Sequence, residues 1–496
     1  MSSQRSPWFA LYALLVGSFM ILLDMTIVAV ANPAIMNDLH ADIANVIWVT
    51  SAYLLTYAVP LLITGRLGDR FGPKNIYLLG LAVFTASSLW CAMSSSIEIL
   101  IAARAVQGLG AALMTPQTMA IITRTFPSTR RGAAMGLWGG VSGLATLVGP
   151  ILGGFLVDAE GWEWIFYINV PIGIIAFVLA VWLVPTLETH EHKFDPVGMV
   201  LSAAGMFLLV FGIQEGNSRD WDGLIWALIT AGVVVIGLFM YNQSRNSEEP
   251  LVPLSLFKDR NFAMSNLALG AVNAALTAMF VPFYFYLQQV QDLSSTGSAL
   301  VLAPMAILAG ILAPVAGKLS DRMAPRTLPT FGFAVFAVTM FGFATLMRPD
   351  TPIVLFLVIG GIAGAANACI WAPLATSATT NLPLHLAGAG SGVYYTTRQI
   401  AAVLGSATVG ALLSARIMAQ HLPTDSPIGE GMADSARMSE PLLEKLSTAL
   451  GEAMYLPAFI LLIGLIASAL LIGNRSAAAD SNTLPPENAD IAVQSH

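Results

Sequence analysis

The chain has 496 residues, of which 56% are hydrophobic and 10% are charged, and its mean hydropathy is +0.73. Soluble domains carry about 25% charged residues, so this composition excludes a water-soluble globular protein and predicts a polytopic membrane protein. The formal net charge is −7 with no basic block, which argues against a nucleic-acid partner. The two cysteines, Cys91 and Cys369, both lie in apolar runs, so we expect small core residues and no disulfide.

Fourteen apolar runs are long enough to cross a bilayer, which takes about 20 residues per helix. They lie at 9–31, 46–65, 75–94, 98–122, 132–156, 163–184, 197–214, 223–241, 262–284, 297–316, 327–346, 353–377, 391–415 and 454–473. The fold class that they predict is an all-α polytopic membrane protein. An even number of spanning helices puts both chain termini on the same side of the membrane.

Lysine and arginine decide which side that is. With the N-terminus inside, 15 of the 22 basic residues fall in inside segments and five in outside segments, while Arg104 and Arg398 fall within helices. The positive-inside rule therefore predicts that both termini are cytoplasmic. Segment 416–453 then becomes one long external loop. Segment 474–496 is rich in Ala, Ser and Pro, and we expect a disordered cytoplasmic tail.

A short motif recurs at equivalent points of the chain. GRLGDRFG (65–72) follows the second predicted helix, and GKLSDR (317–322) follows the second of the last six. Duplicated halves are common in transporters, and alternating access uses such symmetry directly. We predict an N-terminal six-helix bundle over 1–184, two inserted helices with their linkers over 185–260, and a C-terminal six-helix bundle over 261–473.

This repeated motif is predicted to form a conformational latch between the two halves. Its candidate residues are Gly65, Gly68, Asp69, Arg70, Asp321 and Arg322. The glycines shape a tight connection, and an aspartate near a helix end can cap free backbone N–H groups. The alternative is a positive-inside loop with turn residues, which explains the basic residues but not the repetition.

The stretch FMILLDMTIVAV (19–30) places Asp24 inside an apolar helix, where a carboxylate costs roughly 2.5–3.5 kcal/mol on insertion scales. Arg104, in RAVQGLGAALMTPQ, lies at the same depth, roughly 10 Å below the outer boundary at 1.5 Å per residue. We therefore expect the two charges to pair. Gln107 and Thr115 share the helical face of Arg104 and extend a polar stripe toward a cavity. The alternative is a buried structural pair without a role in transport.

The fifth predicted helix carries a cluster of small residues. Gly149, Pro150, Gly153 and Gly154 lie within GPILGG. Small residues allow close helix approach, and proline removes a backbone hydrogen bond and favours a bend. Generic helix packing explains glycine alone, whereas the dense cluster favours a pliable helix at the interface of the two halves.

Arg398, in YYTTRQIAAVLG, is the second intramembrane cation. It either holds Asp69 or its helix end in one state or binds substrate, and the residues alone leave both roles open. The other candidate pocket residues are Asn32, Trp48, Tyr53, Tyr57, Gln107 and Tyr394. Aromatic rings stack on planar cations, although interfacial belts and helix packing account for most aromatic residues of this kind.

Six segments together resemble a known family. They are LDMTIVAVANPAI (23–35), GRLGDRFGPK (65–74), RAVQGLGAA (104–112), GPILGG (149–154), WEWIFYINVPIG (162–173) and YYTTRQIAAVLG (394–405). In this order they resemble motifs of the fourteen-helix drug:proton antiporters of the major facilitator superfamily, the EmrB/QacA type. The resemblance covers nearly the whole chain and implies the major facilitator fold.

The resemblance also implies roles for individual residues. It makes Asp24 the first-helix acid of proton coupling and cation recognition, and Arg104 the arginine of proton movement. Asp69 and Arg70 match the loop that controls switching.

Two positions depart from the family pattern. Asn32 stands where the family has leucine, which can alter the pocket, and Pro73 stands where arginine is common. The loop therefore has one cation fewer than in the family.

These features predict a proton-driven exporter of amphipathic, often cationic drugs or dyes in the inner membrane of a bacterium. No Walker-type nucleotide loop occurs, so ATP is not the expected energy source, and we expect no cofactor and no metal. A membrane enzyme is the rival class, but all six histidines fall in loops. A second alternative keeps the fold and exports an endogenous lipid, siderophore or amino acid. In a Gram-negative bacterium the long external loop could meet a periplasmic adaptor.

Overall fold

The computed structural model describes residues 6–41, 43–189, 195–216, 219, 221–246, 250–420 and 440–472, and these residues form helices without any strand. The helices of the first part are α1 (Pro7–Asp38), α2 (Ile43–Ala58), α3 (Leu61–Phe71), α4 (Pro73–Ala92), α5 (Ile97–Thr125), α6 (Ser128–Glu160), α7 (Trp164–Tyr167), α8 (Asn169–Leu183), α9 (Pro196–Glu215) and α10 (Gly223–Arg245). The second part contains α11 (Arg260–Phe285), α12 (Ser295–Ser320), α13 (Thr327–Leu346), α14 (Ile353–Thr379), α15 (Ala387–Ala419), α16 (Glu440–Ala453) and α17 (Tyr455–Ala469).

Twelve described helical segments are long and apolar enough to cross a membrane, and a bent pair makes thirteen. The bent pair is α2 and α3, which meet at 48° beside Pro60, the residue that precedes α3. The second predicted helix, 46–65, is therefore not one straight span. The predicted helix at 132–156 lies within α6, whose 33 residues are not among the thirteen spans. The structure thus comes close to the predicted count of fourteen.

The chain before the last helix differs from the prediction. We expected a long external loop over 416–453, but α15 continues to Ala419 and α16 begins at Glu440. α16 is amphipathic: Leu446 and Leu450 are buried, while charged residues such as Glu444 and Lys445 lie on its exposed side. Those charges interrupt the apolar run, which is why the sequence does not reveal the helix. The predicted tail, 474–496, lies outside the described residues.

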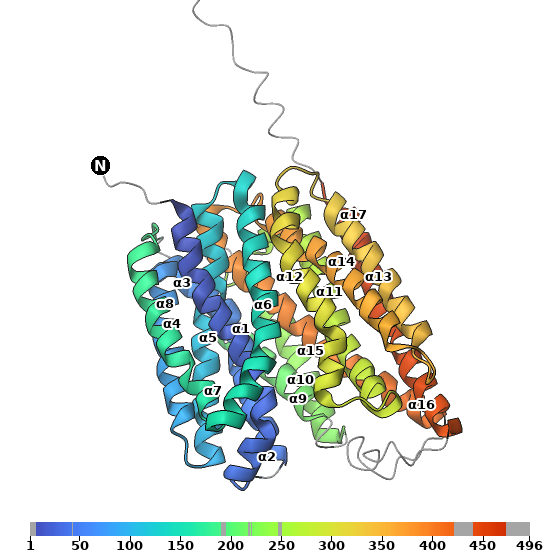
Figure 1. The fold of residues 1–496 in the computed structure, drawn as a ribbon. Coiled ribbons are helices and arrows are strands. Elements are labelled where there is room, and N and C mark those ends of the chain that lie inside the picture. Colours follow the sequence, from blue (N-terminus) through green and yellow to red (C-terminus); the bar gives the residue numbers. More distant parts are fainter. Residues whose placement is uncertain are drawn as a thin grey trace, which may run out of the picture.

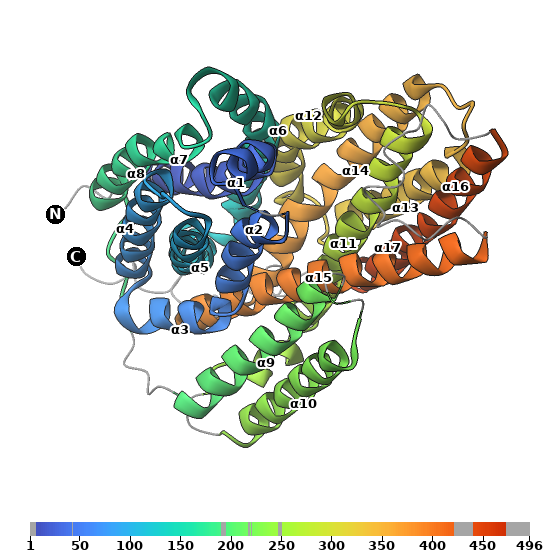
Figure 2. The same ribbon diagram turned by 90° about the horizontal axis from the view of Figure 1, so that it is seen from below.

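Figure 1 shows two helical bundles side by side, one built from α1 to α8 and the other from α11 to α17. α1 begins and α17 ends at the same end of the molecule, drawn at the top. The inserted pair α9 and α10 lies outside both bundles, next to α15 (Figure 2). α9 contacts α2 of the first bundle and α15 of the second, so the insertion covers the line along which the bundles meet.

Glycine pairs bring the two bundles into backbone contact. In the contact of α6 with α12, a Cβ on Gly317 would overlap the carbonyl oxygen of Gly132. In the contact of α3 with α15, a Cβ on Gly388 would overlap the carbonyl oxygen of Gly65. The four residues are glycines because a side chain at any of them would push the helices apart.

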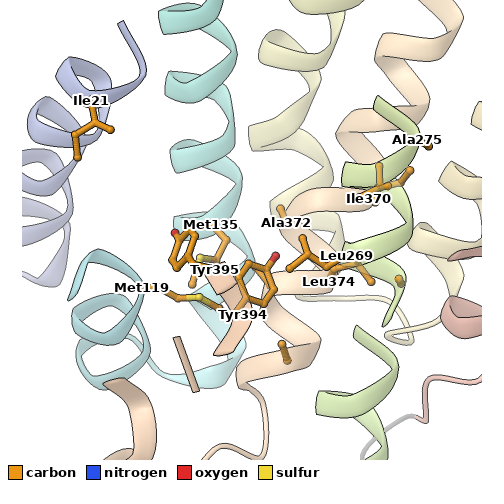
Figure 3. Close-up of a cluster of buried hydrophobic side chains, with 14 of the residues drawn as sticks. Ile21, Met119, Met135, Leu269, Ala275, Ile370, Ala372, Leu374, Tyr394 and Tyr395 are labelled. Carbon is orange, nitrogen blue, oxygen red and sulfur yellow. The ribbon is translucent and has the colours of Figure 1, made fainter. Parts of the chain in front are cut away.

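An apolar cluster joins the bundles near the glycine pairs. Figure 3 shows Tyr394 and Tyr395 of α15 with Met119 and Met135 on one side and Leu374 on the other. Met119 and Met135 belong to α5 and α6 of the first bundle, and Leu374 belongs to α14 of the second. We call this end of the molecule, which holds the repeated motif, the latch end. It is closed by packed side chains from both bundles.

Candidate functional site

A buried ion pair joins α1 to α5. Arg104 Nη1 lies 2.6 Å from Asp24 Oδ2, and the two side chains are 1% and 0% exposed. The expected pairing of these charges is therefore confirmed. Arg104 Nε also donates to the carbonyl oxygen of Val49 at 3.2 Å, so α2 contributes to the same site.

Neutral amides complete the coordination of the carboxylate. Gln107 Nε2 donates to Asp24 Oδ1 at 3.0 Å, and Asn169 Nδ2 donates to the same oxygen at 2.9 Å. Asn169 Nδ2 also lies 3.1 Å from Ser88 Oγ. Hydrogen bonds to an ionised group are stronger than neutral ones and favour the charged form. Every polar contact of the Asp24 side chain is therefore with a hydrogen-bond donor.

Asn169 and Ser88 are members of the site that the sequence reasoning missed. Asn169 opens α8 within WEWIFYINVPIG, and Ser88 lies in α4. A lone asparagine in an apolar motif was an available signal, because buried amides in a membrane are retained only where they find partners. Which partner it finds depends on the packing of α8 against α1 and α4.

Aromatic rings close the site from the side. The guanidinium carbon of Arg104 lies 4.1 Å from the ring centre of Tyr53 and 5.7 Å from that of Phe166. Gly108, one turn further along α5, lets the backbone of Tyr53 approach α5 closely. We expected the polar stripe of α5 to face a cavity. In this conformation Asp24, Arg104 and Gln107 are instead sealed inside the first bundle, and only Thr115 is partly exposed.

Asp69 makes the first contact of the predicted latch. Its two carboxylate oxygens accept hydrogen bonds from the backbone N–H groups of Gly388 and Ala389, each at 2.9 Å. Those N–H groups belong to the first turn of α15 in the other bundle, where the helix dipole favours a negative charge. The expected capping of a helix end by this aspartate is confirmed as geometry, and it occurs between the bundles.

Asp321 forms the equivalent contact at the end of α12. Its oxygens accept from the backbone N–H groups of Gly132 and Ala133 of α6 at 2.7 and 2.9 Å. Burial raises the pKa of Asp321 above its ordinary value, and the two N–H groups offset only part of that rise. The latched form therefore takes up a proton at a higher pH than a free aspartate does.

The other latch candidates have separate surroundings. Gly68 packs against Gln117 of α5, within its own bundle, and Gln117 Nε2 donates to the Thr64 carbonyl at 2.7 Å. The guanidinium of Arg70 lies 5.4 Å from the ring centre of Phe71. Arg322 is exposed.

Arg131 is a further tie between the bundles that the sequence reasoning did not single out. It is buried at the start of α6 and donates to the carbonyl oxygens of Thr123 at 2.7 Å and Phe126 at 3.1 Å. Its Nη1 donates to the Thr379 carbonyl at the end of α14 at 2.5 Å. A cation suits these helix C-termini because their carbonyls are unsatisfied. The positive-inside pattern explains Arg131 equally well, which hides this role in the sequence.

The glycine cluster of α6 does not lie between the bundles. A Cβ on Gly149 would overlap Thr26, and one on Gly153 would lie 2.7 Å from Ile27, so these glycines face α1 of the same bundle. A Cβ on Gly154 would meet only Val30, at 4.0 Å. α6 is one continuous helix through Pro150. The expected interface position applies instead to earlier glycines of α6, such as Gly132, which face α12.

Arg398 lies in the second bundle, away from both latches. Its Nε donates to Asn273 Oδ1 of α11 at 3.2 Å, and its guanidinium carbon lies 4.9 Å from the ring centre of Trp371 of α14. Asp69 bonds to the first turn of α15 instead, ten residues before Arg398. The role of holding Asp69 therefore does not apply in this conformation.

The remaining candidate pocket residues fall in different places. Trp48 contacts the ring of Phe211 on the inserted helix α9, with centres 5.8 Å apart. Tyr57 stacks on Tyr53 at 6.2 Å. Asn32 Oδ1 is buried without a hydrogen-bond partner among the described residues.

Comparison with known proteins identifies the family. Residues 14–406 match the Major Facilitator Superfamily. The chain is 50% identical to an uncharacterized MFS-type transporter of Mycobacterium tuberculosis, over 98% of this chain and 84% of the relative. It is 34% identical to the tetracenomycin C resistance and export protein of Streptomyces glaucescens, over 83% and 77%. It is 31% identical to the multidrug export protein EmrB of Haemophilus influenzae, over 79% and 78%. The chain therefore belongs to the Major Facilitator Superfamily, as a multi-pass membrane transporter of the drug:proton antiporter family with the major facilitator fold.

Proposed function

We propose that this protein is a proton-coupled multidrug exporter that moves amphipathic, often cationic compounds out of the cell by alternating access. The observation that carries the proposal is the buried pair of Asp24 and Arg104. An acid and a base inside the membrane are costly unless paired, and here the acid can take up a proton only at the expense of its bond to the arginine. Relatives named as drug exporters support the same cargo class.

The latches give the proposal its conformational states. Asp69 and Asp321 each join one bundle to a helix start of the other, so the latch end is closed. The positive-inside pattern makes this end cytoplasmic, and both termini with it. The conformation described here is then the one closed to the cytoplasm, in a bacterial inner membrane. Release of both aspartates would let the bundles rock and open the cytoplasmic side.

Asp24 then acts as the coupling group. In the inward-open state the ionised carboxylate helps to attract the cationic substrate. After the bundles rock outward, a proton from outside neutralises Asp24 and the cation leaves. After the bundles rock back and the cytoplasmic side opens, Arg104, which pairs with Asp24, favours the ionised carboxylate and so the release of that proton toward the inside.

The charge balance of this cycle limits the substrates. Exchange of one proton for one monovalent cation moves no net charge, so a pH gradient supplies about 1.4 kcal/mol per unit. A divalent cation would work against about 2.3 kcal/mol per 100 mV of membrane potential. Among the described residues, Asp24 is the one acid that lies deep within a membrane-spanning helix, and divalent cations should be poorer substrates.

Inverted membrane vesicles test the proposal with ethidium as substrate. The variant Asp24→Asn keeps the size of the side chain and one acceptor oxygen but cannot ionise. We expect the rate of ethidium uptake driven by an acid-inside pH gradient to fall at least tenfold in Asp24→Asn. Asp24→Glu should keep part of that rate. Gel filtration and downhill ethidium exchange show whether Asp24→Asn remains folded. Full proton-driven uptake by Asp24→Asn would show that the mechanism is wrong.

A further inference from the structure

Arg398 differs from Arg104, the other arginine deep inside a membrane-spanning helix, by having no acidic partner among the described residues. Among the described residues its single polar contact is the bond from Nε to Asn273. Neither terminal nitrogen of the guanidinium has a hydrogen bond or an ion pair there. The side chain is also partly exposed, in contrast to the sealed Arg104.

Arg398 lies well inside a membrane-spanning segment. It lies 11 residues after the start of α15, about 17 Å along the helix at 1.5 Å per residue. The candidate membrane span runs from Leu384 to Ala419, so Arg398 is far from both of its ends. A charged side chain at this depth is costly and usually marks a pathway for substrate or ions.

The surroundings of Arg398 hold its guanidinium in one orientation. Asn273 is buried and fixes Nε, while the ring of Trp371 lies against the guanidinium carbon. Trp371 is itself held, because its Nε1 donates to Asn367 Oδ1 at 2.5 Å. The edge that carries the two terminal nitrogens is left without a partner. That edge matches a carboxylate, which accepts two parallel hydrogen bonds from a guanidinium.

Aromatic rings lie one turn before Arg398 on the same helix. Tyr394 and Tyr395 precede it in α15 by four and three residues, a spacing that puts them on its side of the helix. The ring of Tyr395 packs on Trp138 of α6, with centres 6.4 Å apart. Arg398 thus lies one turn from a contact between the two bundles, and aromatic rings of this kind can contact the flat part of a bound molecule.

We propose that Arg398, Asn273 and Trp371 form a subsite for the carboxylate of an aromatic substrate. This inference rests on the proposed function and narrows its substrate class: the exporter would also accept zwitterionic or anionic aromatic compounds. The first bundle would supply the proton site, and the second would supply the acid-binding site. Exchange of a zwitterion for one proton carries one positive charge inward, so the membrane potential adds to the driving force.

A matched pair of dyes tests this subsite. Rhodamine 110 carries a free benzoate, and rhodamine 123 is its methyl ester, so the two differ only in the acid. Binding to the purified protein is measured by fluorescence polarisation, with protein-free micelles as the blank. For Arg398→Gln we expect the Kd of rhodamine 110 to rise at least tenfold and that of rhodamine 123 to change less than twofold.

Two further variants control the measurement. Arg416→Gln removes a charge from the same helix at a site that is 47% exposed, and it should leave both Kd values unchanged. Arg398→Lys keeps the charge but loses the planar fork, so rhodamine 110 should bind more weakly than to wild type and rhodamine 123 equally well. If Arg398→Gln does not fold, the binding of the two dyes to Arg398→Lys tests the subsite instead.

The outcomes separate the subsite from the transport mechanism. Equal changes for both dyes, no change for rhodamine 110, or no binding of rhodamine 110 to wild type would overturn the subsite. Proton-driven uptake of rhodamine 123 by inverted vesicles is measured in parallel. Its absence, together with the acid-specific loss of binding, would overturn the proposed function and leave the subsite standing.

Discussion

The two bundles treat an intramembrane arginine in opposite ways. In the first, Arg104 is 1% exposed and bonded to Asp24, Gln107 and the carbonyl of Val49. In the second, Arg398 is partly exposed and bonded to one neutral amide. Both lie on helices of the same protein in the same membrane, so the difference reflects what each bundle must do with the charge.

The comparison teaches that a membrane protein can keep a charge in two ways. It can enclose the charge with an opposite charge, or it can leave the charge accessible to a molecule that binds there. Removing two charges from water is compensated in the first bundle by a short ion pair and additional hydrogen bonds. The second bundle leaves the guanidinium of Arg398 partly exposed, and on the proposal above an incoming anion completes its coordination. Enclosure suits a group that only a proton needs to reach, and access suits a group that meets a molecule.

The largest expected effect lies in the first bundle. Arg104→Gln leaves Asp24 buried and uncompensated, which costs about 3–5 kcal/mol of folding free energy for a broken buried pair. Arg398→Gln, which removes a cation without an acidic partner, should change stability by less than about 1 kcal/mol. Urea unfolding of the purified proteins in detergent measures both. Pairing Arg104→Gln with Asp24→Asn should recover part of the loss, and equal losses for Arg104→Gln and Arg398→Gln would break the comparison.

The two latches sharpen the same contrast between buried and accessible charge. Asn in place of Asp69 or Asp321 keeps one acceptor but points an amide N–H at the second backbone donor, and a hydrogen bond to a charged group contributes about 1.5–3 kcal/mol. Asp69 is 1% exposed and Asp321 is half-buried. We therefore expect Asp69→Asn to shift the population away from the latched state more than Asp321→Asn does.

Spin-label distances between the start of α6 and the end of α12, and between the end of α3 and the start of α15, report the latched population. Asp69→Glu is the matched control, because it keeps the charge and only lengthens the side chain. A larger shift for Asp321→Asn than for Asp69→Asn would contradict the ranking by burial.

Adding a methyl group at a glycine pair should have a smaller effect than breaking a latch. In Gly317→Ala the new methyl group would overlap the Gly132 carbonyl, whereas in Gly139→Ala it would lie 3.5 Å from Ala313, at ordinary contact distance. Overpacking of this kind costs about 1–3 kcal/mol, paid by separating α6 from α12. The same spin-label distances should lengthen for Gly317→Ala and stay unchanged for Gly139→Ala. Equal behaviour of both variants would show that the backbone contact does not set the closed state.

The smallest expected effect belongs to a third arginine, which is at the far end of the helix that carries Arg398. Arg416 lies 3.3 Å from Glu452, and the two side chains are 47% and 36% exposed. Exposed pairs contribute about 0–1 kcal/mol, so Arg416→Gln should leave the free energy of unfolding within about 1 kcal/mol of wild type. A loss comparable to that of Arg104→Gln would mean that exposure does not govern the cost of these charges.

Much of the site followed from local sequence patterns. The pairing of Asp24 with Arg104 follows from two charges at matched depth, because hydrocarbon leaves each of them few other partners. The capping role of Asp69 follows from an aspartate in a repeated motif near a helix end. In contrast, a search for long apolar runs does not predict α16, because the charged residues on its exposed face interrupt the apolar run. Gly149 and Gly153 were assigned to the wrong interface, since a small-residue pattern predicts close packing but not against which helix.

The sequence by itself determined the membrane-spanning helices, the duplicated motif and the family, because apolar length, charge asymmetry and short motifs are local properties of the chain. Only the tertiary structure decided which partners the polar groups find. Asn169 reaches Asp24 from 145 residues away, and Asp69 reaches Gly388 from 319 residues away. Only the packing of the helices leaves Arg398 partly exposed while it seals Arg104. A hydrogen bond depends on distances of a few tenths of an ångström between helices, and no pattern along one helix encodes those distances.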